Sequence, residues 1–209
     1  GNSVSSTEDA DFQATNIRIE NGSYVFNLKT PFEEIKGLQF HLPGRHNLFN
    51  AVTALGMAIL AGTPTDCLHK ALESFKGVKR RFTYKIKTES LVLIDDYAHH
   101  PTEIDALFQA VTEMYPEKEK LIVFQPHLFT RTRDFSIGFA KSLSQFNEVI
   151  LLDIYPAREE PIEGVNSYWL LDNIRIADKK LVSKEALPEA VKNSRSMVKL
   201  LVGAGEIGV

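Results

Sequence analysis

The chain has little cysteine, no long apolar run and no excess of positive charge. Its 209 residues include one cysteine, Cys67, so no intrachain disulfide can form, which suits a reducing cytosol. No apolar stretch approaches the length of a membrane span and no signal peptide is visible, so we expect a cytoplasmic protein without a membrane partner. The net charge of -3 disfavours a general nucleic-acid binder.

Two common catalytic motifs are also missing. No G-x-x-x-x-G-K-[ST] run is present to cradle phosphates, and no G-x-S-x-G elbow is present to carry an acyl nucleophile. Gly203-Ala-Gly-Glu-Ile-Gly208 fits G-x-G-x-x-G, but it follows the last predicted strand instead of opening the first strand–helix unit. We therefore interpret it as a tight strand exit and not as a nicotinamide site. Because the chain starts without methionine and ends abruptly, we expect a fragment of a longer protein.

The composition, 44% hydrophobic and 24% charged, is typical of a globular protein. From residue 82 onward, short apolar runs alternate with helical patterns. Strands are expected at 82–87, 91–94, 121–124, 148–152, 180–183 and 197–202, and helices at 101–114, 134–145, 166–174 and 185–193. Strands separated by helices must be largely parallel, whereas the first two are close enough to form a hairpin at the sheet edge. This part is predicted to be a Rossmann-like three-layer α/β domain with a mostly parallel sheet.

Residues 1–78 show a different pattern. Asn21-Gly22 is a strong hairpin turn signal, and the residues around it alternate between apolar and polar. Strands are expected at 14–19, 24–28 and 38–42, and helices at 51–61, buried on most sides, and at 65–75. Residues 1–11 are expected to be either frayed or part of a severed loop. A basic hinge precedes residue 82, so we predict two domains, an incomplete α/β piece at 1–78 and the Rossmann-like domain at 79–209.

Polar residues are densest directly after the predicted strand 91–94. They are Asp95, Asp96, Tyr97, His99 and His100. Pro101 follows them, at a position where proline readily starts a helix. One interpretation is that Asp95 or His100 caps this helix while the others are solvated. The other is a ligand site, since a carboxylate at a strand end can accept ribose hydroxyls and a histidine can donate to phosphate. A zinc site is disfavoured, because adjacent histidines on an extended turn point in different directions.

A second polar loop follows the next strand, 121–124. It contains His127, Arg131 and Arg133. The planar guanidinium group matches carboxylate or phosphate oxygens, although arginines also bridge to surface acids. Because carboxyl ends of neighbouring parallel strands share one edge of a sheet, the two loops together predict a ligand site there.

Two further segments carry weaker signals. In the run from Gly44 to Asn50, Asn47 is a candidate helix N-cap, while His46 and Asn50 have donors for a planar heterocycle. At the predicted hinge, Arg80 and Arg81 can reach a phosphate bound in a cleft, although most paired basic residues are merely solvated.

These motifs resemble those of the Mur ligases, the ATP-dependent amide-forming enzymes of peptidoglycan synthesis. Gly44, His46, Asn47 and Asn50 stand in the pattern G-x-H-N-x-x-N-x-x-A of the central domain of the family, and Asp96-Tyr97-Ala98-His99 with Pro101 matches its carboxy-terminal signature. The segments most similar to the members that join L-alanine to UDP-N-acetylmuramate are 77–82, 95–103, 124–127 and 129–134. Leu128 departs from the family, which most often carries arginine there.

The resemblance implies roles for individual residues. His46, Asn47 and Asn50 would lie on the adenine side of ATP, Arg81 at the phosphates and Asp96 at the ribose. A second set would lie near L-alanine and the reacting carboxylate: Tyr97, His99, His127, Arg131 and Arg133. Of these, His99, His127 and Arg131 are the expected catalytic residues. No metal ligand is expected, because the family binds Mg²⁺ mostly through residues upstream of this segment.

The resemblance also implies a three-domain enzyme in which this chain is the end of the central domain and all of the third. ATP would activate the carboxylate of UDP-N-acetylmuramate as an acyl phosphate, which the amine of L-alanine then attacks. The chain alone, without the phosphate-binding loop and the missing N-terminal and central domains, is expected to be inactive. Three alternatives stay open: a recycling ligase that attaches a whole peptide, a stand-alone nucleotide or amino-acid binding module, and a metal hydrolase that uses Asp95, Asp96, His99 and His100.

Overall fold

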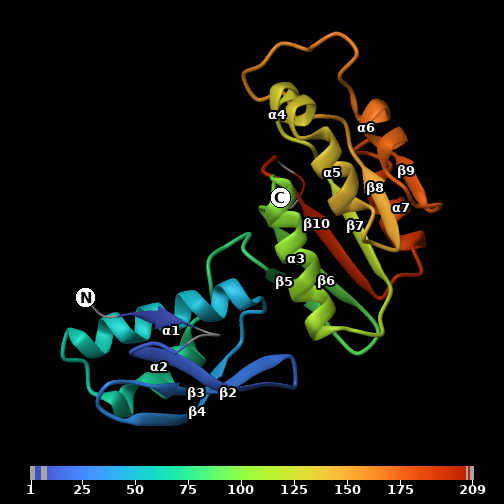
Figure 1. The fold of residues 1–209 in the computed structure, drawn as a ribbon. Helices are drawn as coiled ribbons and strands as arrows, with labels where there is room; N and C mark the ends of the chain where they lie inside the picture. The colour runs from blue at the N-terminus through green and yellow to red at the C-terminus, as the bar shows by residue number, and fades with distance from the viewer. Residues whose placement is uncertain (1–2, 6–8, 206, 208–209) are drawn as a thin grey trace. The chain divides into compact units, whose positions relative to one another are not determined.

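The computed structural model describes residues 3–5, 9–205 and 207. The chain divides into two compact units, Gly1–Gly77 and Val78–Val209 (Figure 1). The elements of the first unit are β1 (Val4–Ser5), β2 (Phe12–Glu20), β3 (Ser23–Lys29), β4 (Glu34–Phe40), α1 (Arg45–Leu60), a 3₁₀ turn (Thr65–Cys67) and α2 (Leu68–Ser74). Within the described residues of the chain, no helix is both long and apolar enough to cross a membrane.

The first unit contains a four-stranded sheet in the order β1-β2-β3-β4. The predicted hairpin is confirmed: β2 and β3 are antiparallel around Asn21 and Gly22, which have positive φ angles of 52° and 71°. Of the two alternatives for residues 1–11, fraying is wrong for residues 3–5. Val4 and Ser5 pair in parallel with β2, and the backbone N–H of Ser3 donates to Asp11 at 2.7 Å.

Helix α1 begins at Arg45, earlier than the predicted residue 51. It also buries one face and not most sides. That face consists of Leu48, Ala51, Val52, Leu55 and Gly56. On the other side, Met57 and Leu60 are 68% and 50% exposed. The many apolar residues of this helix therefore led to a prediction of more burial than the structure has.

The second unit is the predicted α/β domain. Its elements are β5 (Thr83–Lys87), β6 (Val92–Asp96), α3 (Pro101–Met114), β7 (Lys120–Phe124), α4 (Phe129–Asp134), α5 (Ser136–Leu143), β8 (Glu148–Leu151), α6 (Ser167–Asn173), β9 (Lys179–Leu181), α7 (Leu187–Asn193) and β10 (Val198–Val202). The six strands are ordered β5-β6-β10-β7-β8-β9. All neighbours are parallel except β5 and β6, which form the predicted edge hairpin.

Three layers result from the alternation of side chains along the strands. Apolar residues of one sheet face pack with α3, α5 and α6, including Ile94, Phe124 and Val202. Those of the other face, such as Leu121 and Ile150, pack against α7. Figure 1 shows β10, drawn in red, between β6 and β7. Since adjacent strands lie about 4.8 Å apart, the loops that leave β6 and β7 start about 10 Å from each other.

Candidate functional site

Asp96 is the last residue of β6, and its carboxylate is held by backbone donors on two sides. Oδ2 accepts the N–H of Phe82 at 2.7 Å and Oδ1 accepts the N–H of Ala98 at 2.8 Å. Burial raises the pKa of Asp96, while these two bonds and the positive charge of Arg81 act in the opposite direction. The structure therefore presents an oriented carboxylate at the predicted edge, and the exposed residue Arg81 directly precedes Phe82, one of its two donors.

In the rest of the turn after β6, His100 caps a helix, whereas the side chain of His99 does not. His100 is the N-cap of α3: its side chain accepts the N–H of Thr102 at 3.4 Å, and its ring contacts Phe135 edge-on at 4.5 Å. Capping explains this histidine. His99 is placed differently, because its Nδ1 lies 2.9 Å from the carbonyl oxygen of Tyr97 and the two rings meet edge-on at 5.2 Å.

His127, in the loop after β7, stacks on the ring of Tyr155 with centroids 5.6 Å apart. Its Nδ1 lies 3.3 Å from Nη1 of Arg131. Burial lowers the pKa of His127, and the positive charges of Arg131 and His99 lower it further. Asp96, Val202 and Phe124 are paired at the same level of the sheet, so the two predicted loops leave it at one carboxyl edge.

Arg131 and Arg133 lie on α4, a short helix that the sequence did not reveal. Leu128 precedes it with a φ of 72° and no side-chain cap. The cap comes from a distant loop, because Glu159 accepts the N–H of Thr130 at 2.9 Å and also its hydroxyl. Arg131 is half-buried beside His127, whereas Arg133 is exposed and bonded to Asp134 at 2.8 Å.

Tyr155 and Glu159 are the residues that the sequence analysis missed at this edge. Both lie after β8, which is parallel to β7. The backbone N–H of Leu128 donates to the carbonyl oxygen of Tyr155 at 2.9 Å, so this third loop supports the second one. A signal was available: polar residues after another parallel strand belong to the same edge.

His46, Asn47 and Asn50 lie in the first two turns of α1. The prediction that Asn47 caps this helix is wrong. The N-cap is Gly44, with a φ of 99°, and Nδ2 of Asn47 instead donates to the carbonyl oxygen of Pro43 at 2.6 Å. His46 and Asn50 are exposed and four residues apart, so they share one face of the helix.

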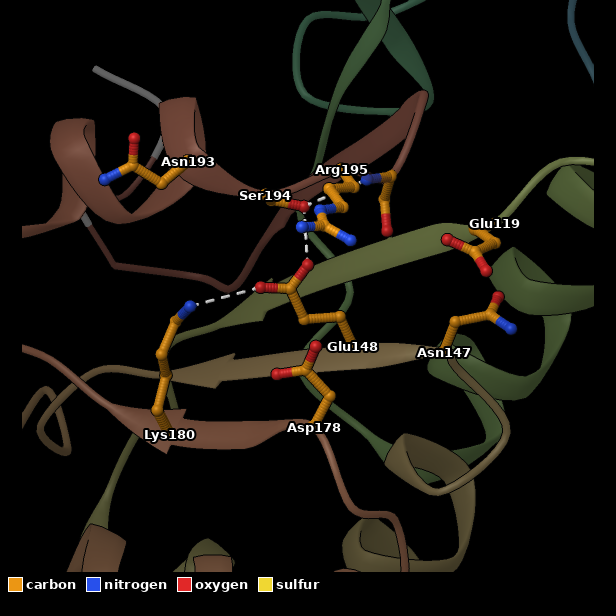
Figure 2. A pocket seen from close by; sticks show the side chains of 9 residues that line it. Glu119, Asn147, Glu148, Asp178, Lys180, Asn193, Ser194 and Arg195 are labelled. Carbon is orange, nitrogen blue, oxygen red and sulfur yellow. Dashed lines mark hydrogen bonds and ion pairs between the residues drawn. The ribbon is translucent and has the colours of Figure 1, made fainter.

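The opposite, amino-terminal edge of the sheet carries a polar pocket of about 330 Å³. Figure 2 shows Glu148 at its centre, bonded to Lys180 at 3.2 Å and to Ser194 at 2.5 Å. These contacts join the first residue of β8 to β9 and to the C-cap residue of α7. The pocket lies away from the motif loops, and Glu148 and Lys180 form an ion pair in it. Across residues 3–5, 9–205 and 207, no group of three or more histidine, cysteine, aspartate or glutamate side chains is arranged to hold a metal ion.

Two substitutions near His127 are expected to shift its pKa in opposite directions. Arg131→Met removes a nearby positive charge, so we expect the pKa of His127 to rise, while remaining below 6.5 because burial persists. Glu159→Gln removes a charge that raises this pKa, so we expect it to fall further. Titration of the histidine ring resonances by NMR measures both. Shifts of the same sign in the two variants would contradict the arrangement of charges described here.

The direction of the pKa shift of His127 also determines how this residue affects stability at different pH values. Its folded pKa lies below the unfolded value of 6.5, so neutral His127 contributes stability above pH 6.5, and this contribution is lost as the pH falls through the folded pKa.

Residues 80–205 match the family model described as Mur ligase, glutamate ligase domain. The chain belongs to the Mur ligase family. It is 63% identical over 208 residues to a UDP-N-acetylmuramate--L-alanine ligase of Christiangramia forsetii, covering 100% of this chain and 46% of the relative. It is 60% identical to the ligase of the same name from Flavobacterium psychrophilum, with the same coverage. The chain thus spans about half the length of these Mur ligase relatives.

Solved structures agree with this family assignment. The crystal structure of the UDP-N-acetylmuramate-alanine ligase of Thermotoga maritima matches with a TM-score of 0.78 and 25% identity, over 96% of this chain and 44% of the other. A folylpolyglutamate synthase from Thermotoga maritima matches with a TM-score of 0.71 at 16% identity, over 93% of this chain and 44% of the other, which shows a shared fold alone. The Rossmann-like domain predicted from the sequence is the fold of this Mur ligase domain.

Proposed function

We propose that this chain is the part of a UDP-N-acetylmuramate–L-alanine ligase that contacts ATP and L-alanine. The observation that carries the proposal is the convergence of His99, His127 and Arg131 at the carboxyl edge that also holds Asp96. The enzyme would join L-alanine to UDP-N-acetylmuramate through an acyl phosphate, as a step of peptidoglycan synthesis in the bacterial cytoplasm.

Each group suits a different part of that reaction. In the proposal, Arg131 and His127 bind the carboxylate of L-alanine and hold its amine toward the acyl carbon. Tyr97 and His99 form the adjacent wall of the amino-acid site. Such a reaction needs no protein nucleophile, because catalysis depends on positioning and on stabilising developing negative charge. Arg133, which is bonded to Asp134, has at most an outer role.

Nucleotide contacts are proposed for each unit by itself. His46, Asn47 and Asn50 would contact adenine, Asp96 the ribose and Arg81 the phosphates. The oriented carboxylate of Asp96 and the exposed guanidinium of Arg81 fit this chemistry, because ribose needs acceptors and phosphates need cations. ATP supplies the phosphoryl group that activates the carboxylate. Mg²⁺ would accompany it, held mostly by residues of the full-length enzyme outside this chain.

The proposal is tested by measuring ADP release from the full-length enzyme with UDP-N-acetylmuramate and different acceptors. We expect turnover with free L-alanine and little with a tripeptide, whereas the recycling ligase would show the reverse preference. The 209-residue chain alone should give no turnover, because it lacks a phosphate-binding loop. Absence of ADP release from the full-length enzyme with either acceptor would contradict the proposed function.

A further inference from the structure

Asp95, the neighbour of Asp96, is a buried charge with an unusual environment. Its side chain is 1% exposed, and among the described residues neither carboxylate oxygen accepts a hydrogen bond. Two cations lie close: Nε of Arg80 at 3.6 Å and Nζ of Lys85 at 3.7 Å. A buried carboxylate is strongly unfavourable unless it is paired, so Asp95 attracts Arg80 into the domain.

The guanidinium of Arg80 bonds at the same time to the end of β10. Nη1 donates to the carbonyl oxygen of Gly205 at 2.9 Å and Nη2 to that of Gly203 at 2.5 Å. These carbonyls have little freedom to move. A Cβ atom at position 203 would lie 2.8 Å from the backbone oxygen of Gln125, and one at position 205 would lie 2.5 Å from its side-chain oxygen. Arg80 is therefore anchored to a close-packed corner.

The backbone on both sides of Arg81 is fixed to the Asp96 turn. The carbonyl oxygen of Arg80 accepts the N–H of Tyr97 at 2.7 Å, and the N–H of Phe82 donates to Asp96 at 2.7 Å. Arg80 and Phe82 have φ angles of 59° and 46°, in the left-handed region that side chains of this size disfavour. Residues held in such conformations need support from surrounding contacts, which the side chain of Arg80 provides.

We propose that Arg80 is a positioning residue for the nucleotide: its pairing with Asp95 and the glycine carbonyls holds residues 80–82 in a strained bend that presents Arg81 beside Asp96. The inference rests on the proposed function for the role of these two residues. Arg80 also lies over the ring of Tyr97, 5.1 Å from its centroid. Of the two backbone bonds of the bend, one is made to the main chain of Tyr97 and the other to the carboxylate of Asp96.

The test uses Arg80→Lys in the full-length enzyme. Truncation to alanine would remove one of the two cations beside buried Asp95 and is avoided, whereas lysine keeps the charge but cannot reach Asp95 and two carbonyls together. We expect the KM for ATP to rise about tenfold, since small displacements of positioned groups have effects of this size. The KM for L-alanine and the melting temperature should change little. The matched control is Lys85→Met, which removes the other cation beside Asp95 and should leave the KM for ATP within about twofold.

A double variant separates positioning from general stabilisation. If Arg80 acts through Arg81, Arg80→Lys combined with Arg81→Met should raise the KM for ATP no more than Arg81→Met alone. Three results would overturn the inference. The first is a double variant whose rise in KM for ATP is the product of the two single rises, and the second is an unchanged KM for ATP in Arg80→Lys. The third is a parallel rise of both KM values with a lower melting temperature. The failure of the proposed function is seen separately, because the wild-type enzyme would then release no ADP with L-alanine.

Discussion

Replacing Arg131 with methionine is expected to lower kcat/KM for L-alanine in the full-length enzyme by about 10²-fold, because the charged donor to the carboxylate of L-alanine is lost and the amine is no longer held in the attacking position. The guanidinium lies 3.3 Å from Nδ1 of His127 and is half-buried, so its charge is poorly screened. Methionine keeps much of the length of the side chain and removes the charge. Steady-state kinetics with L-alanine varied at saturating ATP measures the effect.

Arg133→Met is the matched control, because the residue has the same chemistry and lies two positions away on α4. Its guanidinium is exposed and bonded to Asp134, so we expect a loss no larger than about threefold. Equal losses in the two variants would mean that α4 needs positive charge in general and that Arg131 has no specific place beside His127.

Asp96→Asn is expected to raise the KM for ATP by about 50-fold or more, since a bidentate acceptor of ribose hydroxyls is lost. Folding should be affected less. The amide cannot accept both backbone bonds, from Phe82 and Ala98, but it also removes a buried charge whose cost is visible in the raised pKa of Asp96. These two effects on the free energy of unfolding oppose each other.

The comparison for this variant is Asp172→Asn, which changes an exposed carboxylate on α6 of the same domain. It should alter neither the KM for ATP nor the melting temperature. A KM for ATP that is unchanged in Asp96→Asn would remove Asp96 from the ribose role, whatever the activity with L-alanine.

The order of strands and helices in the second unit was predictable because burial on both faces of a parallel strand leaves unbroken apolar runs. The strand β7, which is buried along its whole length, is an example. Helix α4 was missed because its sequence, Phe129-Thr-Arg-Thr-Arg-Asp134, has no apolar period. It is held by Glu159 from another loop, and a contact of this kind leaves no local signal. Similarly, α1 begins after a glycine with no capping side chain.

The position of the candidate site was also predictable, because the strands are parallel. Polar residues that follow parallel strands meet at one edge, which brought Asp96 and His127 into a common hypothesis. The partners that hold them were not predictable. The bond from Arg80 to Gly205 joins residues 125 positions apart, and local patterns carry no information about such a pair. The interpretation of Gly203 to Gly208 as a strand exit holds for Gly203 and Gly205, while Glu206 and Gly208 lie outside the described residues.

The central place of β10 has a consequence for biosynthesis. Among the described strands, β10 is the last to leave the ribosome, yet it separates β6 from β7. Until residues 198–202 are translated, these two strands lack the neighbour that sets their spacing, and Arg80 lacks its glycine carbonyls. Contacts between segments so distant in sequence form slowly. A nascent chain therefore carries both motif loops long before they can form a site, so incomplete chains released early would have neither the fold nor the activity.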